Sequence, residues 1–264
     1  IIHSNNHYTA NIAKHSSIFI PLSIKLIQTI HSDFHNLGKL KKYNANKYIF
    51  VNNHIYNNAV NENLYLKNKS HIIYNGIEFS DKLCRMKDEH KITITVASRL
   101  EESKGIQIVI EALKMFTEEY NKGLRLLIAG TGNLEAELNK SLKNTCINFS
   151  FLGVVTDMKS IYKTTDIFIF PSLTDYFGYS WLEAVDLECF LIMSDFDGIQ
   201  HLLEENDNYF IFIRGSHIDL NLKIRNAIEL GENRITKAKN LKNKLINKYS
   251  AGQMATKTMQ VYVE

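Results

Sequence analysis

The chain has 264 residues, of which 45% are hydrophobic and 22% are charged, and its formal net charge is +3. These values predict a globular chain with one large domain or two small ones. No run approaches the roughly 20 apolar residues of a membrane-spanning helix. No basic segment followed by an apolar one opens the chain, so a cytoplasmic location is expected.

The cysteines and the charge distribution exclude other classes of protein. Cys84, Cys146 and Cys189 are scattered and odd in number, which supports neither a disulfide framework nor a Cys-x-x-Cys metal site. Residues 1–90 carry 11 Lys and Arg against 6 Asp and Glu. This basic segment is compatible with a peripheral contact at the inner face of a membrane, but a solvated surface explains it equally well. Nucleic acid is not expected as a partner, because no dense basic stripe with interleaved aromatic residues occurs.

The first 80 residues contain short apolar runs separated by polar, Asn-rich stretches. These runs predict strands at 24–30, 48–51 and 71–74, with a helix at 53–66 between the last two. The sequence opens on Ile1-Ile2-His3 without Met. We therefore expect the first domain to be incomplete, with its first strands missing.

In the second half of the chain, after a polar stretch at 81–90 that is expected to be a linker, strands alternate with helices. The strands are predicted at 91–97, 124–129, 149–153, 167–170 and 189–193. Helices are predicted at 106–116, 134–142, 157–163, 219–229 and 232–249, with another starting at Gly178. This alternation predicts a doubly wound parallel sheet. The expected domains are 1–85 and 86–246, with a tail at 247–264 that packs back on the first domain.

Residues 165–198 organise the second half. An apolar run ends at Pro171, which cannot donate to a sheet ladder, and a polar loop then leads into the helix at Gly178 and a further apolar strand. Ligands of parallel sheets bind at the carboxyl ends of the strands, and the free N–H groups at a helix N-terminus suit a phosphate. A ligand site is therefore predicted around this loop.

Two acids, Asp175 and Glu183, stand eight residues apart in this loop and helix. The pattern resembles the acid-x7-Glu signature of the retaining group 1 glycosyltransferases, which have the GT-B fold and use sugar nucleotides. The resemblance implies that Asp175 contacts the donor sugar and that Glu183 holds the ribose hydroxyls. Asp175 stands where the family usually has Glu. Its side chain is one methylene shorter and reaches less far, so the choice of sugar and the rate are expected to differ.

The loop Ser98–Gly105 carries two cations, Arg99 and Lys104, before the next predicted helix. Fixed cations beside a helix N-terminus stabilise the charge that grows on a diphosphate leaving group. The spacing also resembles the Arg-x4-Lys-Gly of the group 1 family, which implies a pyrophosphate site. The alternative is a solvated loop in which Glu101 and Glu102 are the partners of these cations.

The segment Thr29-Ile30-His31 resembles a strand end of the family's N-terminal domain, and HIIYNGIEF resembles the segment that leads to its interdomain linker. The resemblance implies that His31 binds a donor-sugar hydroxyl or orients the acceptor. The alternative is a loop histidine without a role, because this region has many others.

Weaker signals surround these motifs. The pair Gly130-x-Gly132 lacks the full dinucleotide-binding spacing and is expected only to close a strand. Gly153-Val154-Val155 resembles the family segment that meets the nucleotide base, so Val154 joins the expected donor site. Phe177, Gly178 and Tyr179 join it as neighbours of the acid pair, although Tyr179 is equally explained as a packing residue.

Together these patterns predict an α/β, GT-B-like protein with two Rossmann-like doubly wound parallel-sheet domains, the first incomplete. The resemblance implies a retaining glycosyltransferase that moves a sugar from a UDP- or GDP-sugar to a hydroxyl of a glycan or lipid-linked acceptor in surface polysaccharide or glycolipid synthesis. No metal and no cofactor beyond the donor are expected, because the basic loop neutralises the diphosphate. The alternatives are a non-catalytic sugar-nucleotide-binding subunit, a truncated remnant and a GT-B sugar-nucleotide epimerase.

Overall fold

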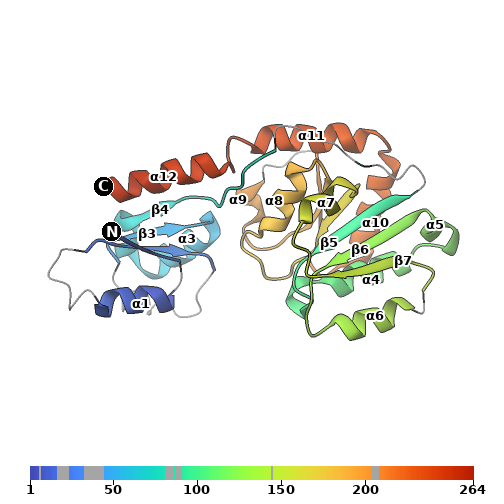
Figure 1. The fold of residues 1–264 in the computed structure, drawn as a ribbon, viewed down its shortest axis with the longest axis horizontal. Coiled ribbons are helices and arrows are strands. Elements are labelled where there is room, and N and C mark those ends of the chain that lie inside the picture. The colour runs from blue at the N-terminus through green and yellow to red at the C-terminus, as the bar shows by residue number, and fades with distance from the viewer. Residues whose placement is uncertain are drawn as a thin grey trace. The chain divides into compact units, whose positions relative to one another are not determined.

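The computed structural model describes residues 1–5, 7–16, 24–32, 45–80, 86, 91–143, 145–203 and 208–264. The chain divides into two compact units, each built on a parallel sheet (Figure 1). The first unit contains residues 1–78, 197–204 and 247–264, and the second contains 79–196 and 205–246. The predicted α/β class with two parallel sheets is confirmed. The linker predicted at 81–90 lies outside the described residues, apart from Met86.

The first unit holds a four-stranded parallel sheet of order β1-β2-β3-β4. Its strands are β1 (Ile2–Ser4), β2 (Leu26–Ile30), β3 (Lys47–Phe50) and β4 (Ser70–Ile72). Its helices are α1 (His7–Ser16), α3 (Asn53–Glu62), the 3-10 helix η2 (Leu64–Lys69), α9 (Ile199–Leu202) and α12 (Ala251–Val263). Every residue of β2 is buried, as expected for a central strand of a parallel sheet.

The C-terminal helix α12 closes the core of the first unit. Its Val261 packs with Ile27, Ile49 and Ile73, one residue from each of three neighbouring chain segments. The side chain of Ser250 caps the helix by accepting from the N–H of Gln253 at 3.2 Å. Burial of this apolar stripe is what orders the last residues of the chain.

The second unit holds a six-stranded parallel sheet of order β10-β9-β8-β5-β6-β7. Its strands are β5 (Ile92–Ala97), β6 (Leu124–Ala129), β7 (Asn148–Gly153), β8 (Ile167–Phe170), β9 (Phe190–Ser194) and β10 (Phe210–Phe212). Its helices are η3 (Glu102–Lys104), α4 (Ile106–Lys114), α5 (Glu118–Lys122), α6 (Glu135–Lys143), α7 (Met158–Lys163), α8 (Tyr179–Asp186), α10 (His217–Glu229) and α11 (Asn233–Leu245).

Helices cover both faces of this second sheet. One face packs against α4, α6 and α10, and its core includes Ile94, Val96, Leu126, Ile128, Ile167, Ile169, Val109, Leu113, Leu220 and Ile224. Figure 1 shows α7, α8 and α11 together on the other face. The strands β8 and β9 are buried at every position, as expected for strands covered on both faces of a parallel sheet. No helix in the described part of the chain is both long and apolar enough to span a membrane.

The strand order of the second unit fixes where a ligand can bind. Strand β5 pairs with β6 on one side and with β8 on the other, and the order of the chain reverses between these two pairings. In doubly wound sheets, the crevice at such a switch point, outside the carboxyl ends of the strands, is the ligand site. The loops that follow β5 and β8 are the two loops with the predicted motifs.

Candidate active site

The loop after β5 and the loop after β8 are in direct contact. Gly105 has a φ of 71°, and a Cβ at this position would lie 2.1 Å from the carbonyl oxygen of Pro171. The N–H of Leu173 donates to the carbonyl of Ser103 at 2.9 Å. Only a residue without a Cβ allows this approach, which explains why glycine follows the basic residue of the motif.

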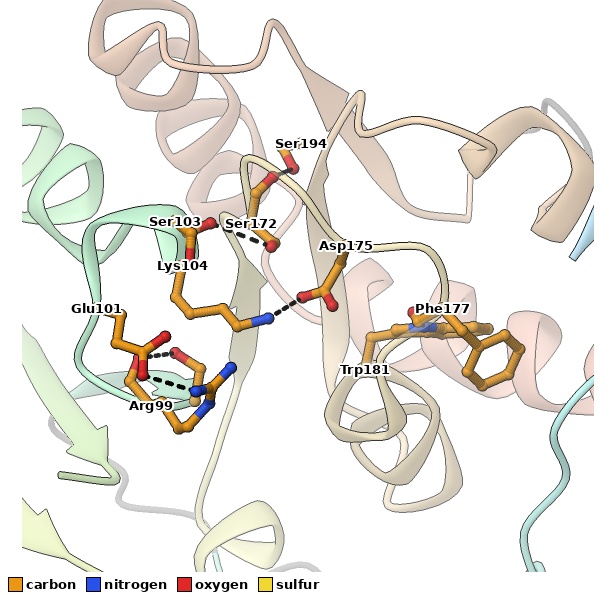
Figure 2. Close-up of polar contacts among 10 residues, drawn as sticks. Arg99, Glu101, Ser103, Lys104, Ser172, Asp175, Phe177, Trp181 and Ser194 are labelled. Atoms are coloured by element: carbon orange, nitrogen blue, oxygen red, sulfur yellow. Dashed lines mark hydrogen bonds and ion pairs between the residues drawn. The ribbon is translucent and has the colours of Figure 1, made fainter. Parts of the chain in front are cut away.

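This contact brings Lys104 and Asp175 together. The Lys104 ammonium donates to the Asp175 carboxylate at 2.7 Å, and both side chains are largely buried, with 17% and 22% of their surface exposed (Figure 2). Arg99 leaves the same loop but is 70% exposed, and its guanidinium pairs with Glu101 at 2.7 Å. The structure therefore pairs Lys104 with Asp175, the first of the two predicted acids. Arg99 instead pairs with Glu101, as the alternative of a solvated loop predicted.

Helix α8 begins beside this ion pair at Gly178. Gly178 has a φ of 73°, and a Cβ there would lie 2.4 Å from the ring of Phe170. Phe177 is buried and its carbonyl accepts from the indole N–H of Trp181 at 2.6 Å, so Trp181 is a packing residue of the core. Tyr179 is 46% exposed at the first position of the helix. The helix N-terminus thus has a fixed position and one exposed aromatic ring.

Glu183 lies on α8, one turn into the helix and partly buried. Its carboxylate accepts a hydrogen bond from the hydroxyl of Tyr162 at 3.2 Å. Tyr162 belongs to α7 and is 1% exposed. Burial, followed by the negative charge of Glu183, raises the pKa of the Tyr162 phenol, so the phenol stays protonated and acts as a donor.

A second carboxylate of α8, Asp186, faces the protein interior. It is 1% exposed and pairs with the ammonium of Lys242 from α11 at 3.1 Å. It also accepts from the N–H of Ser80 at 2.7 Å and from the Ser80 hydroxyl at 2.8 Å. These contacts attach residue 80, near the start of the second unit, and helix α11 to the helix that carries Glu183.

Comparison with known proteins adds the family to this geometry. Residues 85–246, more than half of the chain, match the family model described as glycosyl transferases group 1. The chain belongs to this family. An uncharacterized glycosyltransferase of Methanocaldococcus jannaschii is 27% identical to it over 222 residues, which cover 74% of this chain and 54% of that protein. The capsular polysaccharide biosynthesis glycosyltransferase CapM of Staphylococcus aureus is 25% identical over 232 residues, which cover 81% of this chain and 60% of that protein.

Solved structures resemble this group 1 chain in fold. HepE from Anabaena, in complex with UDP and glucose, superposes with a TM-score of 0.82 over 100% of this chain and 77% of that chain, at 16% sequence identity. Sucrose-phosphate synthase from Thermosynechococcus elongatus gives a TM-score of 0.78 at 15% identity. The GT-B-like fold predicted from the sequence is therefore confirmed. The group 1 chain spans 54% and 60% of the length of the two curated relatives named above.

Two expected site residues of the group 1 chain lie outside the β5–β8 edge. Val154 follows β7 and is 77% exposed. His31 belongs to the first unit, where it directly follows β2. Near it, His3 of β1 hydrogen-bonds through its two ring nitrogens to the hydroxyls of Tyr262 at 2.6 Å and Thr29 at 2.7 Å. Burial lowers the pKa of His3, and the charge of His31 lowers it further.

Three side chains that contact helix α8 or belong to it were not singled out from the sequence. Tyr162 is an ordinary apolar position of a predicted helix, and Asp186 and Lys242 look like surface charges of helices. No local pattern marks them, because their partners lie 21 and 56 residues away along the chain.

An Asp-x-Asp motif, which we did not expect from the sequence, does occur at Asp195-Phe196-Asp197, directly after β9. The carboxylate of Asp195 accepts from the N–H of Arg214 at 2.6 Å. The described residues contain no group of three or more His, Cys, Asp or Glu side chains arranged to hold a metal ion.

Proposed function

We propose that this chain forms the donor-binding part of a retaining glycosyltransferase, which moves a sugar from a nucleotide-diphosphate donor to a hydroxyl acceptor. The observation that carries the proposal is the Lys104–Asp175 pair, 2.7 Å long and largely buried, at the switch point of the sheet. A cation for phosphate and an acid for sugar hydroxyls are there held next to the N-terminus of α8.

In this proposal the diphosphate is held by groups on both loops. An ammonium has three N–H donors, so Lys104 keeps two for phosphate oxygens while one donates to Asp175. Arg99 and the N–H groups that follow Gly178 add positive potential. When the bond between the anomeric carbon and the diphosphate oxygen breaks, its electron pair leaves with the diphosphate, and these groups stabilise the charge that develops there.

The remaining residues bind the sugars in this proposal. Asp175 accepts hydrogen bonds from hydroxyls of the donor sugar, and Glu183 accepts from those of the ribose. Tyr179 and Phe177 shape the wall beside the helix N-terminus, and Val154 meets the base. His31 hydrogen-bonds a hydroxyl of the donor sugar or orients the acceptor.

The substrate class is proposed from the relatives. HepE was solved with UDP and glucose and also with UDP-glucose, and CapM is named for capsular polysaccharide biosynthesis. We therefore propose a UDP-sugar or GDP-sugar as the donor and a growing surface glycan or lipid-linked glycan as the acceptor. A location at the cytoplasmic face of the membrane belongs to the same proposal.

The binding step is tested with UDP and UMP, which differ by one phosphate. Calorimetry should show that the wild type binds UDP more tightly than UMP, and that Lys104→Ala reduces UDP affinity about tenfold or more with a smaller effect on UMP. Lys140→Ala removes an exposed cation of α6 and serves as the control. Equal affinity of the wild type for UDP and UMP would contradict a diphosphate site.

The reaction is tested with labelled UDP- and GDP-sugars. Transfer or slow hydrolysis that disappears in Arg99→Ala and Glu183→Ala supports a transferase, and NMR of a transfer product shows whether the anomeric configuration is retained. Binding without turnover supports a sugar-nucleotide-binding subunit or a remnant. A changed sugar that stays on the nucleotide supports an epimerase.

A further inference from the structure

Glu183 is a partly buried carboxylate whose described hydrogen-bond donor is the hydroxyl of Tyr162, at 3.2 Å. Glutamate has three rotatable side-chain bonds, and holding it in one rotamer costs conformational entropy. A carboxylate that must meet a ligand in one orientation is therefore more effective when a fixed donor already holds it.

Tyr162 is such a fixed donor. Its ring is 1% exposed and packs edge-on against Phe168 of β8, with the ring centroids 5.6 Å apart. Its backbone carbonyl accepts from the thiol of Cys189 at 3.3 Å and from the N–H of Thr165 at 3.1 Å. The phenol oxygen is therefore positioned by β8 and by the residue that precedes β9, and both strands belong to the central sheet.

The chemistry of the pair allows one arrangement. The raised pKa of the phenol keeps its proton in place, so Tyr162 donates and Glu183 accepts. The bond is to one oxygen of the carboxylate, Oε2. The other oxygen, and the remaining lone pair of the first, stay available for hydroxyl donors of a ligand.

We propose that Tyr162 is a positioning residue, which holds Glu183 in the orientation that receives the ribose hydroxyls of the donor. This inference rests on the proposed function. Tyr162 itself does not touch the donor, and it acts only through the carboxylate. The consequence is that the discrimination between ribose and deoxyribose, and not only the overall affinity, depends on a buried phenol behind helix α8.

The test compares UDP with 2′-deoxy-UDP and 3′-deoxy-UDP in the wild type, Tyr162→Phe, Glu183→Gln and the double variant, by calorimetry. The wild type should prefer UDP over at least one deoxy analogue by about tenfold. Tyr162→Phe should reduce this preference severalfold, because Glu183 then samples rotamers that do not meet the hydroxyl. In the Glu183→Gln background, Tyr162→Phe should have little further effect.

Tyr249→Phe is the matched control. Tyr249 is also fully buried and donates its hydroxyl to a backbone carbonyl, that of Leu202 at 2.5 Å, but it lies in the first unit. Its substitution should leave the preference for UDP unchanged. Thermal unfolding of each variant shows that the protein measured is folded.

Four results would overturn the inference. If Tyr162→Phe weakens UDP and both deoxy analogues by the same factor, the phenol has only a structural role. If its effect adds fully to that of Glu183→Gln, the two residues act independently. If the wild type binds UDP but does not discriminate against either analogue, Glu183 does not bind the ribose hydroxyls. The proposed diphosphate site would not be contradicted by that result. A wild type that does not bind UDP removes the proposed UDP donor as well.

Discussion

Breaking the buried ion pair between Lys242 and Asp186 should lower the free energy of unfolding strongly. The ammonium of Lys242 donates to the carbonyls of Ser80 and Asp186, both at 2.8 Å, and lies 3.1 Å from the Asp186 carboxylate. Lys242 is 7% exposed and Asp186 is 1% exposed. Lys242→Met keeps the length of the side chain but leaves a buried carboxylate without its cation and two carbonyls without their donor.

The expected cost follows from this burial. Removing one partner of a buried ion pair costs about 3–5 kcal/mol, because the remaining charge stays desolvated. The two hydrogen bonds from Ser80 to Asp186 remain, which places the expectation in the lower half of that range. The control is Lys114→Met, which breaks an even shorter ion pair, 2.7 Å from Glu111, but between side chains that are 32% and 51% exposed. Its cost should stay below about 1 kcal/mol.

The assay is urea unfolding followed by the fluorescence of Trp181. This is the only tryptophan of the chain, and it is fully buried in α8 of the same unit. With a slope of about 1–3 kcal/mol per molar urea, Lys242→Met should lower the midpoint by roughly 1 M or more. Asp186→Asn combined with Lys242→Met should be more stable than Lys242→Met alone, because it removes the uncompensated charge.

Two results would refute this reasoning. A loss for Lys242→Met as small as that for Lys114→Met would show that water reaches Asp186 and that the pair is effectively a surface pair. A double variant less stable than Lys242→Met by the full cost of Asp186→Asn would show that the two side chains are not coupled.

Two further predictions follow from the backbone and from the first unit. Gly178→Ala should cost about 2–5 kcal/mol, the sum of about 1–2 for the positive φ and about 1–3 for overpacking against Phe170. Gly215→Ala, with a φ of 81° and nothing within 4 Å of the new Cβ, should cost only the first part, and equal losses would exclude the clash. His3 should titrate below about 6.5 by NMR, and its pKa should rise in His31→Gln but stay below that value, because burial is the larger cause. Since its folded-state pKa lies below the unfolded value, the free energy of unfolding should fall as the pH drops from about 6.5 through the folded pKa, and this slope should weaken in His3→Gln.

The central strands of the second unit could be predicted well because they are buried on both faces. Such strands are rich in apolar residues, and here β6 ends before Gly130 and β8 ends before Pro171. Strands β6 and β8 match the predicted 124–129 and 167–170 residue for residue. Strands β1 and β10, which have three residues each, were not predicted. Helix α12 was expected only as a tail.

The site loops could also be located from the sequence, because Pro171, Gly105 and Gly178 mark the ends of strands and the start of a helix. What the sequence did not indicate was the partner of each side chain. Lys104 and Asp175 are 71 residues apart and were interpreted as ligands of different parts of the donor, yet they form an ion pair with each other.

The order of apolar runs, turns and helix starts therefore determined the class of fold, the edge of the sheet that carries the motifs and the family, since these depend on local pattern and on connections between neighbouring elements. The tertiary structure decided which charges are buried and with whom. The burial of Tyr162 behind Glu183, the pairing of Lys242 with Asp186 and the assignment of 197–204 to the first unit all depend on contacts between distant segments. Burial is a property of the assembled core, and a charged or phenolic side chain has the same local sequence whether it ends in water or in that core.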